Sequence, residues 1–352
     1  MGQLVRSIAQ DAPASTVQRT IRLATGGLAF SCAEGDVLLR AAQRAGIAFP
    51  YECNVGSCGN CKFELVEGQV TMEWEQAPGW TEADRQRKRF LGCQARPLGD
   101  CTIKLRPHAK YAPRHPPQRV GAVLAARRSI THDIEEFSCG LDSPQHFEPG
   151  QYALLQLPGI EGPRAYSMSN VAADGLVWEF QVRRLPGGRG SNALFARVQP
   201  GERLEIDGPY GMAWLRRDAP RDLLLLAGGS GLAPMVSIAR GASIEPALAQ
   251  RQIHFLYGGR TPADICGEDM LRALPGWGGR IHYEAVVSSP AAGSAWTGAA
   301  GFLHEVASER FGERLAQMEI YFAGPPVMAQ AMQQMLLAAK VPFDQVHFDQ
   351  FY

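Results

Sequence analysis

The sequence predicts a multi-domain α/β protein with a strand-rich first domain, an antiparallel β-barrel and a parallel sheet covered by helices. Three observations predict this class. The chain has 352 residues, which at ~150 residues per domain is enough for two or three domains. Its composition, 45% hydrophobic and 20% charged, is typical of globular proteins. Closely spaced strand patterns in the middle of the chain give way to alternating strands and helices near its end, and these two arrangements need different sheets.

The first predicted domain covers residues 17–106 and is rich in strands. One helix is expected in DVLLRAAQRAG, where apolar residues from Val37 to Ala45 recur at helical spacing and Gly46 ends the helix. The stretch KFELVEGQVTME alternates and turns at Glu67 and Gly68, which predicts a hairpin. A linker at residues 107–118 follows, and its four prolines and lack of apolar periodicity indicate an extended, semi-rigid segment.

The second predicted domain covers residues 119–219. Its strand patterns are QYALLQL, GLVWEFQVRR and ERLEIDGPYG, and they are separated by Pro-Gly turns. Such closely spaced strands predict a small antiparallel barrel. We expect DGPYG, from Asp207, to form a tight turn that closes it.

The third predicted domain covers residues 220–352. In DLLLLAGGSGLAPMVSIARG an apolar strand leads through a glycine loop into a helix. QIHFLYGGR and MEIYFAGPP are two further apolar strands that end in glycine, and VMAQAMQQMLLAAK is a helix. This alternation predicts a parallel sheet covered on both faces.

Charge and targeting signals narrow the possible partners. Lys+Arg and Asp+Glu both number 35, so nothing predicts attraction to nucleic acid or to an anionic membrane. The N-terminal stretch lacks an apolar core of signal-peptide length. The longest apolar run, near Leu223, is too short to span a bilayer. We therefore expect a cytoplasmic protein, in which clustered cysteines indicate metal binding or catalysis rather than disulfides.

Three cysteines stand close together in YECNVGSCGNC. The spacing Cys53-x4-Cys58-x2-Cys61 is that of a plant-type [2Fe–2S] site, which needs a distant fourth cysteine. A zinc site would more naturally show two C-x2-C pairs, and a redox pair would leave Cys53 unexplained. Spacing alone leaves Cys93 and Cys101 as candidates for the fourth ligand, although DCTIKL reads as a strand. Cys32, Cys139 and Cys266 read as core residues.

Two further motifs indicate phosphate-bearing ligands. RAYSMSN, from Arg164, sets a cation beside an aromatic ring and two hydroxyls, as an anionic planar ligand would need, although an ordinary strand with one surface arginine is the plainer alternative. PGGRGSNALF is a glycine loop that enters a helix, an anion-binding arrangement. AGGSGLAP follows a buried strand and opens a helix, which is the context of a dinucleotide pyrophosphate site.

The cysteine loop, together with the later LGCQ, resembles the chloroplast-type ferredoxin domain of bacterial oxygenase reductases over about residues 17–106. The resemblance implies a β-grasp fold and a [2Fe–2S] cluster. The ligands that it implies are Cys53, Cys58, Cys61 and Cys93.

The R-x-Y-S motif resembles the flavin domain of the ferredoxin–NADP reductase superfamily. The resemblance implies that Arg164, followed by Ala165, holds the flavin pyrophosphate, while Tyr166 and Ser167 take the catalytic positions beside the isoalloxazine ring. Gly190 and Ser191 would add contacts to the pyrophosphate. FAD is expected rather than FMN, because the ferredoxin domain comes first in the chain.

The third domain is similar to the nicotinamide domain of the same superfamily, and the residues implied to bind the coenzyme are Gly229, Ser230, Gly231, Leu232, Tyr257, Arg260, Asp264, Gly324 and Pro325. Many relatives have Cys where this chain has Ala323, beside the nicotinamide. NADH is expected as the donor, because Asp264 offers a carboxylate to the ribose and no second basic residue accompanies Arg260. Phe351 or Tyr352 is expected either to lie against the flavin or to serve only in packing.

These parts together resemble the reductase components of bacterial multicomponent oxygenases. A flavin accepts an electron pair as hydride and releases electrons singly, so it can join NADH to an iron–sulfur cluster. The expected acceptor is a separate oxygenase or hydroxylase acting on aromatic compounds or hydrocarbons. Two alternatives remain: a reductase that serves another acceptor such as a sugar dehydrase, and a non-catalytic redox sensor. The basic segment TEADRQRKRF is expected to be either a solvated helix face or a docking surface for an acidic partner.

Overall fold

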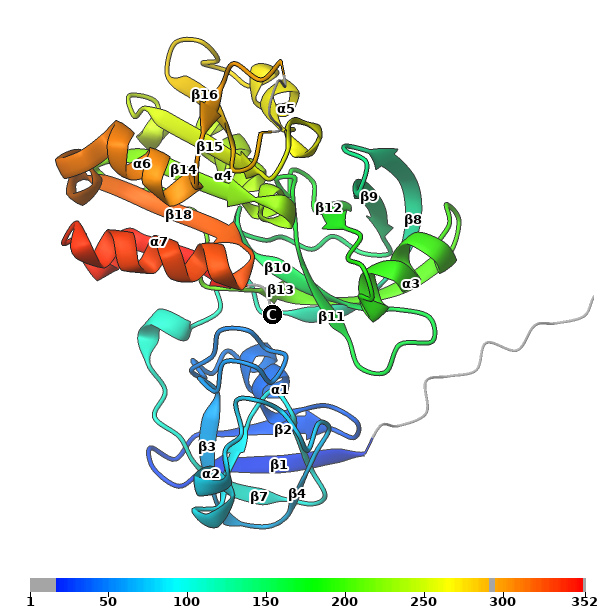
Figure 1. Cartoon of the computed structure of the whole chain (residues 1–352). Helices are drawn as coiled ribbons and strands as arrows, with labels where there is room; N and C mark the ends of the chain where they lie inside the picture. Colours follow the sequence, from blue (N-terminus) through cyan, green and yellow to red (C-terminus); the bar gives the residue numbers. More distant parts are fainter. Residues whose placement is uncertain (1–16, 291–294, 351–352) are drawn as a thin grey trace, which may run out of the picture. The chain divides into compact units, whose positions relative to one another are not determined.

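The computed structural model describes residues 17–290 and 295–350, and its contacts divide the chain into two compact units (Figure 1). The first unit runs to Tyr51 and resumes from Cys58 to Ala112. The second comprises Glu52–Ser57 and the chain from Pro113 onward. Within the described residues we find no helix whose length and apolar character would let it span a bilayer.

The first unit contains a mixed five-stranded sheet. In order of pairing its strands are β2 (Ala29–Ala33), β1 (Gln18–Leu23), β7 (Cys101–Lys104), β3 (Lys62–Glu67) and β5 (Arg89–Leu91). β1 runs parallel to β7, and the other pairs are antiparallel. The unit also holds the helices α1 (Leu38–Arg44) and α2 (Glu82–Gln86) and the 3-10 turn η1 (Ala109–Tyr111). Because α1 buries most of its length beside β2, the sheet grasps one helix, as a β-grasp domain does.

The local predictions for this unit were partly right. The predicted helix is α1, and Gly46 follows it with a φ of +75°, a conformation that glycine adopts without a steric penalty. The predicted hairpin is wrong. The chain does turn at Gly68, but β4 (Val70–Met72) leaves β3 and pairs with β6 (Ala95–Pro97) in a separate two-stranded sheet.

The second unit begins with an antiparallel sheet that nearly closes into a barrel. In order of pairing its strands are β11 (Arg164–Ser167), β10 (Tyr152–Gln156), β13 (Arg203–Tyr210), β8 (Gln118–Ser129), β9 (Ile134–Leu141) and β12 (Val177–Arg183). A bridge between Met168 and Phe180 brings the two edges together. The interior is filled by residues such as Trp178, Phe137 and Phe180, all fully buried.

Two details of the barrel depart from or extend the sequence interpretation. DGPYG is not a tight turn, because all of it except Gly211 belongs to β13. Residues 107–118, predicted as a linker, contain η1 and the first residue of β8. Just before that strand, Arg114 and His115 both contact the buried carboxylate of Glu148, at 3.3 and 3.4 Å, which ties the chain to the barrel as it enters.

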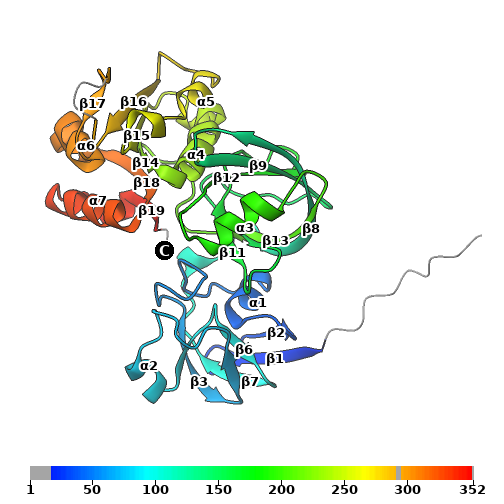
Figure 2. The ribbon, with the colours of Figure 1, turned by 45° about the vertical axis from the view of Figure 1, so that its right-hand side comes forward.

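The rest of the second unit is built around a six-stranded parallel sheet (Figures 1 and 2). In order of pairing its strands are β17 (Ala299–Ala300), β16 (Ile281–Val287), β15 (Ile253–Gly259), β14 (Asp222–Gly228), β18 (Met318–Gly324) and β19 (Val346–Gln350). Its helices are α4 (Leu232–Ile244), α5 (Glu268–Arg272), α6 (Leu303–Phe311) and α7 (Pro326–Ala338), and α3 (Arg189–Arg197) belongs to the barrel. Short 3-10 segments are η2 (Gly229–Gly231), η3 (Pro246–Leu248), η4 (Pro262–Asp264), η5 (Gly312–Gln317) and η6 (Phe343–Gln345).

Alternation along β14 explains why this sheet is buried on both faces. Leu223 and Leu225 point into a core shared with α4, whereas Leu224 and Leu226 point into a core shared with α6 and α7. Successive side chains of a strand face opposite sides, so a run of leucines suits a strand between two helical layers. All strands run the same way, and their carboxyl ends therefore meet at one edge of the sheet, where ligands of such folds bind.

Candidate functional site

The cysteine loop joins α1 to β3, and its residues from Cys58 onward belong to the first unit. The sulfurs of Cys61 and Cys93 lie 3.3 Å apart, and both residues are buried. The Gly92 amide donates to the Cys61 carbonyl at 2.8 Å, which fixes the turn after β5 against the loop. The Asn60 amide points at the sulfur of Cys58 at 3.5 Å. Cys53 precedes these residues on the same loop, in the segment 52–57.

The backbone of this loop can curl because Gly56 and Gly59 take φ values of +91° and +78°. Residues other than glycine rarely adopt such positive φ values. Cys101, the other candidate for the fourth ligand, is the first residue of β7, and its sulfur faces the carbonyls of Gln69 and Gly99. Paired thiols with an amide directed at a sulfur fit a [2Fe–2S] cluster, whose sulfurs commonly accept such bonds.

The R-x-Y-S motif forms β11, the edge strand of the barrel. Nη1 of Arg164 donates to the carbonyls of Glu161, Gly162 and Pro163 at 3.0–3.2 Å. Ala165 is exposed, whereas Tyr166 is partly covered and packs against the barrel core. Burial raises the pKa of Tyr166 to about 12, which keeps its hydroxyl protonated at neutral pH.

Ser167 ends this strand with an unusual environment. The residue is 6% exposed, and its hydroxyl has no hydrogen-bond partner among the described residues. A buried hydroxyl without a partner costs about 1–3 kcal/mol. Such an orphan fits a position where a ligand atom completes the hydrogen bonding, as the flavin assignment requires.

The N-terminus of α3 packs against β11. A Cβ on Gly190 would lie 2.9 Å from Cγ of Arg164 and 3.3 Å from the hydroxyl of Tyr166, so only glycine lets the helix start so close. Because a helix N-terminus attracts anions, the arrangement joins a partial positive charge to the Arg164 guanidinium. The Ser191 hydroxyl is used within its own loop, since it accepts from the Leu185 amide at 3.1 Å.

The glycine loop follows β14, at the carboxyl edge of the parallel sheet. Gly229 has a φ of +56°, Ser230 is partly covered, and Leu232, which starts α4, is fully buried. A Cβ on Gly231 would come within 1.9 Å of the Ala323 carbonyl oxygen, so this loop touches the end of β18 directly. Tyr257 at the end of β15 donates its hydroxyl to the Gly229 carbonyl at 3.2 Å. The three strand ends thus form one cradle.

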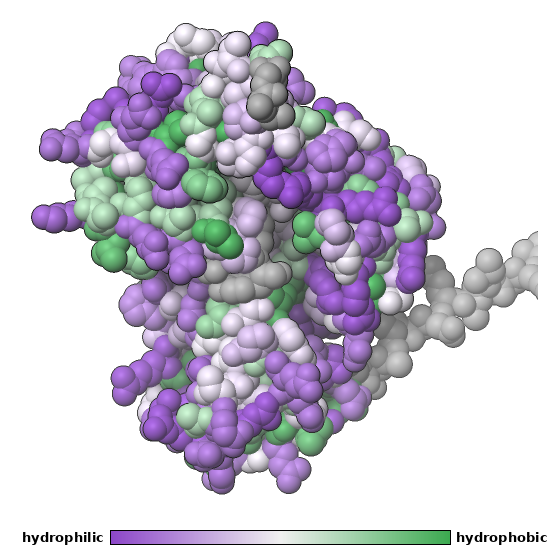
Figure 3. Space-filling model, viewed as in Figure 1, coloured by the Kyte–Doolittle hydropathy of each residue, from purple (hydrophilic) through white to green (hydrophobic). Residues whose placement is uncertain are grey.

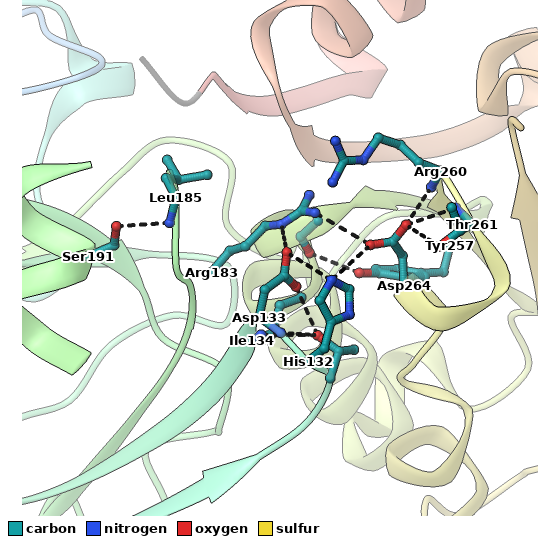
Figure 4. A network of polar contacts seen from close by, with 12 residues as sticks. His132, Asp133, Ile134, Arg183, Leu185, Ser191, Tyr257, Arg260, Thr261 and Asp264 are labelled. Atoms are coloured by element: carbon teal, nitrogen blue, oxygen red, sulfur yellow. Dashed lines mark hydrogen bonds and ion pairs between the residues drawn. The ribbon is translucent and has the colours of Figure 1, made fainter. Parts of the chain in front are cut away.

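Asp264 lies beside this cradle, but its carboxylate is already engaged (Figure 4). Oδ2 accepts from the amides of Arg260 and Thr261, at 3.1 and 2.8 Å, and from the Thr261 hydroxyl. Burial alone would raise the pKa of Asp264, but these bonds and nearby arginines hold it below its ordinary value. The carboxylate caps the turn η4 and leaves little capacity for a ribose. The Arg260 side chain extends away from it.

Arg183, which the sequence interpretation did not single out, joins the barrel to this turn. Its Nε donates to Asp133 at 2.7 Å, and its Nη2 lies 3.5 Å from Oδ1 of Asp264 (Figure 4). A Cβ on Gly229 would be 3.1 Å from its guanidinium. His132, Asp133 and Asp264 are close enough to hold a metal ion. The Arg183 guanidinium already supplies the positive charge that these two carboxylates need.

The remaining predicted residues lie at the end of β18. Gly324 is buried, Pro325 is exposed at the start of α7, and Ala323 is fully buried. The cysteine at position 266 lies near Tyr257 rather than near this strand end, and burial raises the pKa of its thiol to about 11. Phe351 lies outside the described residues.

Comparison with known proteins agrees with this division. Three family models match in succession: a 2Fe-2S iron-sulfur cluster binding domain at residues 21–98, an oxidoreductase FAD-binding domain at residues 121–214, and an oxidoreductase NAD-binding domain at residues 225–334. The chain therefore contains binding domains for an iron–sulfur cluster, for FAD and for a nicotinamide dinucleotide, in that order.

Known proteins also match along almost the whole chain. The ferredoxin–NAD(P)+ reductase CarAd of Metapseudomonas resinovorans is 39% identical, with 92% of this chain and 96% of that protein aligned. The ferredoxin–NAD+ reductase component of the alkene monooxygenase system of Xanthobacter autotrophicus is 38% identical over 92% and 98%. The solved structure of the ferredoxin reductase in carbazole 1,9a-dioxygenase matches with a TM-score of 0.88 and 36% identity, covering 96% of this chain and all of that one.

Proposed function

Because this chain belongs to the family of ferredoxin–NAD(P)+ reductases that combine an iron–sulfur, an FAD and an NAD domain, we propose that it delivers electrons from NADH to a separate oxygenase component. The proposed route runs from NADH to FAD, then to the [2Fe–2S] cluster, and on to the oxygenase. The substrate class of that partner is an aromatic compound or another hydrocarbon, as the names of the relatives indicate for their own systems. The three domains along one chain carry this conclusion.

The cluster would be held by Cys53, Cys58, Cys61 and Cys93. Support comes from the 3.3 Å approach of two of these sulfurs and from the amide directed at a third. Cys101 is excluded from the proposed set because β7 fixes it beside two carbonyls.

Bound flavin would supply the conversion between hydride transfer and single-electron transfer. Arg164 and the N-terminus of α3 at Gly190 would bind its pyrophosphate, and Ser191 would hold the loop in shape. Tyr166, protonated and partly buried, would pack against the ring. Ser167 would donate its unpartnered hydroxyl to a ring atom.

The nicotinamide coenzyme would lie across the glycine loop, with its pyrophosphate over residues 229–232. Tyr257 shapes this loop through Gly229, and Gly324 and Pro325 would border the nicotinamide. Asp264 would act by positioning Arg260 and Arg183, since its carboxylate is engaged. NADH is favoured because Arg260 has no second basic neighbour in GGRTPADI to share a 2′-phosphate, and the nearby Arg183 guanidinium is already engaged by Asp133 and Asp264.

The proposed domains are 17–106 for the ferredoxin domain, 107–118 for the linker, 119–219 for the flavin domain and 220–352 for the nicotinamide domain. The proposed compartment is the cytoplasm, where NADH is available and cluster thiolates are not oxidised to disulfides.

An anaerobic titration with NADH tests the proposal. Purified holoprotein should contain iron and FAD, and NADH should bleach the flavin absorbance and then produce the EPR signal of a reduced [2Fe–2S] cluster. Steady NADH oxidation with cytochrome c as acceptor would separate a reductase from a redox sensor. Protein that contains neither iron nor flavin after oxygen-free preparation would overturn the proposal.

A further inference from the structure

The segment after α2 forms an exposed basic surface on the ferredoxin unit. It consists of Arg85, Arg87, Lys88 and Arg89 around the indole of Trp80, and we call it the α2 face. Residues 81–90 contain four cations and two carboxylates, Glu82 and Asp84. Asp84 is 6% exposed and pairs with Lys62 at 2.8 Å, so it does little to offset the outward positive charge.

The geometry argues against an ordinary solvated helix face. α2 ends at Gln86, so Arg87, Lys88 and Arg89 lie beyond the helix and cannot form its ion pairs. The one intrahelical pair joins Arg85 to Glu82 at 3.8 Å. Within the described residues, the side chains of Arg87, Lys88 and Arg89 have no ion pair or hydrogen bond. Arg87 and Lys88 thus remain without a charge partner, and Arg89 stands opposite Glu64 in the pairing of β5 with β3 without forming an ion pair in the described structure.

The α2 face is also held rigidly. Trp80 donates its indole N–H to the Arg89 carbonyl at 2.7 Å, and the Arg85 guanidinium stacks over the Trp80 ring at 3.8 Å. Lys88 adopts a φ of +51°, which is unusual for a residue other than glycine and sets the direction of its side chain. Figure 3 shows mainly hydrophilic residues over the part of this unit where α2 lies in Figure 1.

Backbone contacts connect this face to the cluster loop. A Cβ on Gly59, between Cys58 and Cys61, would lie 3.0 Å from the Gly79 carbonyl, directly before Trp80. Aromatic rings continue inward from the surface: Trp80 to Phe90 at 5.6 Å, and Phe90 to Phe63 at 6.0 Å. Phe63 is buried and stands two residues after Cys61. A partner seated here would therefore lie beside the loop that carries the cluster ligands.

We propose that the α2 face is the docking surface for the electron acceptor, and that the acceptor presents an acidic protein surface. This inference rests on the proposed function. Uncompensated cations around an aromatic side chain match the composition of protein interfaces, where opposite charges accelerate encounter and aromatic residues anchor the contact. Each NADH yields NAD⁺, a proton and two electrons, so two one-electron acceptors would dock in turn, and each leaves reduced by one electron.

The test compares full-length holoprotein with the double variant R87E/K88E. Arg22→Glu is the matched control, because Arg22 is 59% exposed on β1 and two strands, β7 and β3, separate β1 from β5. The probes are cytochrome b5, an acidic heme protein, and cytochrome c, a basic one. The second-order rate of reduction by excess NADH is measured for each at low and moderate ionic strength, and ferricyanide reduction is measured in parallel.

At low salt the double variant should reduce cytochrome b5 about tenfold more slowly, because its new carboxylates repel an acidic protein. It should reduce cytochrome c faster, because the same carboxylates attract a basic protein. Its dissociation constant for oxidised cytochrome b5, measured by titration without NADH, should rise by a similar factor. Ferricyanide reduction and the R22E variant should change less than twofold. The docking proposal would be overturned if the double variant changed the reduction rates of both cytochromes in the same way, or if R22E changed these rates as much as the double variant does. Failure of the unmodified protein to reduce any acceptor with NADH would instead overturn the proposed function.

Discussion

Arg183 on the barrel strand β12 and Asp264 in the turn η4 of the nucleotide region lie 3.5 Å apart and join two parts of the second unit. The same guanidinium is held by Asp133 at 2.7 Å and lies against Gly229 of the glycine loop. A contact of this kind fixes the loop relative to the barrel, and so would fix the proposed nicotinamide position relative to the proposed flavin position.

Replacing Arg183 with methionine should weaken coenzyme binding without loss of FAD. Hydrogen bonds to charged groups contribute about 1.5–3 kcal/mol, so the KM for NADH should rise roughly tenfold or more. Arg310→Met is the control, because Arg310 is an exposed residue of α6 that pairs with Glu284 and does not contact Arg183 or its partners. Steady-state kinetics and the FAD-to-protein ratio measure both effects. An unchanged KM in R183M would show that the contact does not position the loop.

Gly231→Ala should disable the glycine loop. Its Cβ would meet the Ala323 carbonyl at 1.9 Å, and a backbone atom cannot move aside cheaply. We expect flavin reduction by NADH to slow at least tenfold in stopped-flow experiments, with a lower melting temperature. Gly279→Ala is the control, because its Cβ would meet only an ordinary contact at 3.7 Å. Normal reduction rates in G231A would contradict the close packing described here.

Ser167→Ala should slow the reduction of the flavin by NADH without weakening the binding of FAD. If the buried hydroxyl serves the flavin, its loss should slow hydride transfer roughly tenfold to a hundredfold while FAD remains bound. The apoprotein should become no less stable, because an unsatisfied polar atom is removed. Stopped-flow reduction and thermal melting of both forms check these outcomes, and Ser167→Thr should keep part of the rate. Apoprotein destabilised by S167A would mean that the hydroxyl has a structural partner instead.

The four-thiolate assignment predicts opposite results for two cysteines. Cys93→Ser should abolish or severely weaken the cluster, whereas Cys101→Ser should keep full iron content, because the Cys101 sulfur faces carbonyls on β7. Iron analysis and EPR of the reduced proteins distinguish the two. Cluster loss in C101S with a normal cluster in C93S would exchange the assignments.

Glu148 should make stability depend on pH in the acidic range. A hydrogen bond from His115, together with Arg217 and Arg114, lowers its pKa from 4.5 to about 2 despite burial. Because the folded-state pKa is depressed, the ionised carboxylate stabilises the fold above pH 4.5, and this contribution is lost as the pH falls toward about 2. Because solvent screens the half-exposed cations around it, Glu148→Gln should cost about 1–2 kcal/mol at pH 7.

Urea unfolding across this pH range measures the effect, and Glu205→Gln, at an exposed position on β13, is the control. The difference between wild type and E148Q should shrink steadily on acidification. A difference that stays constant with pH would mean that the carboxylate charge is not its source.

Local patterns in the sequence predicted the parts of this fold that depend on neighbours along the chain. The leucine run of β14 and its glycine loop appear where expected, because period-two burial and left-handed glycines are local properties. β4 was misassigned because its partner β6 lies more than twenty residues further along the chain, and a turn at Gly68 does not determine pairing. Likewise, 31 residues separate Cys61 from Cys93, so spacing could not show that their sulfurs meet.

Two site residues show the same limit. Asp264 reads in the sequence as an available carboxylate, yet three donors of its own turn engage one of its oxygens. Arg183 gave no signal beyond a charge at the end of a strand, because its partners Asp133 and Asp264 come from distant segments. A list of polar residues cannot separate groups that meet ligands from groups that hold the backbone.

Because position 323 is alanine rather than cysteine, the C-terminal part of the chain has one thiol fewer that an oxidant could attack. From Pro113 to the C-terminus the sequence contains only two cysteines, and burial raises the pKa of both, to about 12 for Cys139 and about 11 for Cys266. Oxidants and alkylating reagents attack thiolates, which these residues do not form at neutral pH. Peroxide formed when an oxygenase reduces oxygen without oxidising its substrate would thus damage the cysteines of the ferredoxin domain first. The flavin and nicotinamide domains would still transfer electrons from NADH to a small artificial acceptor.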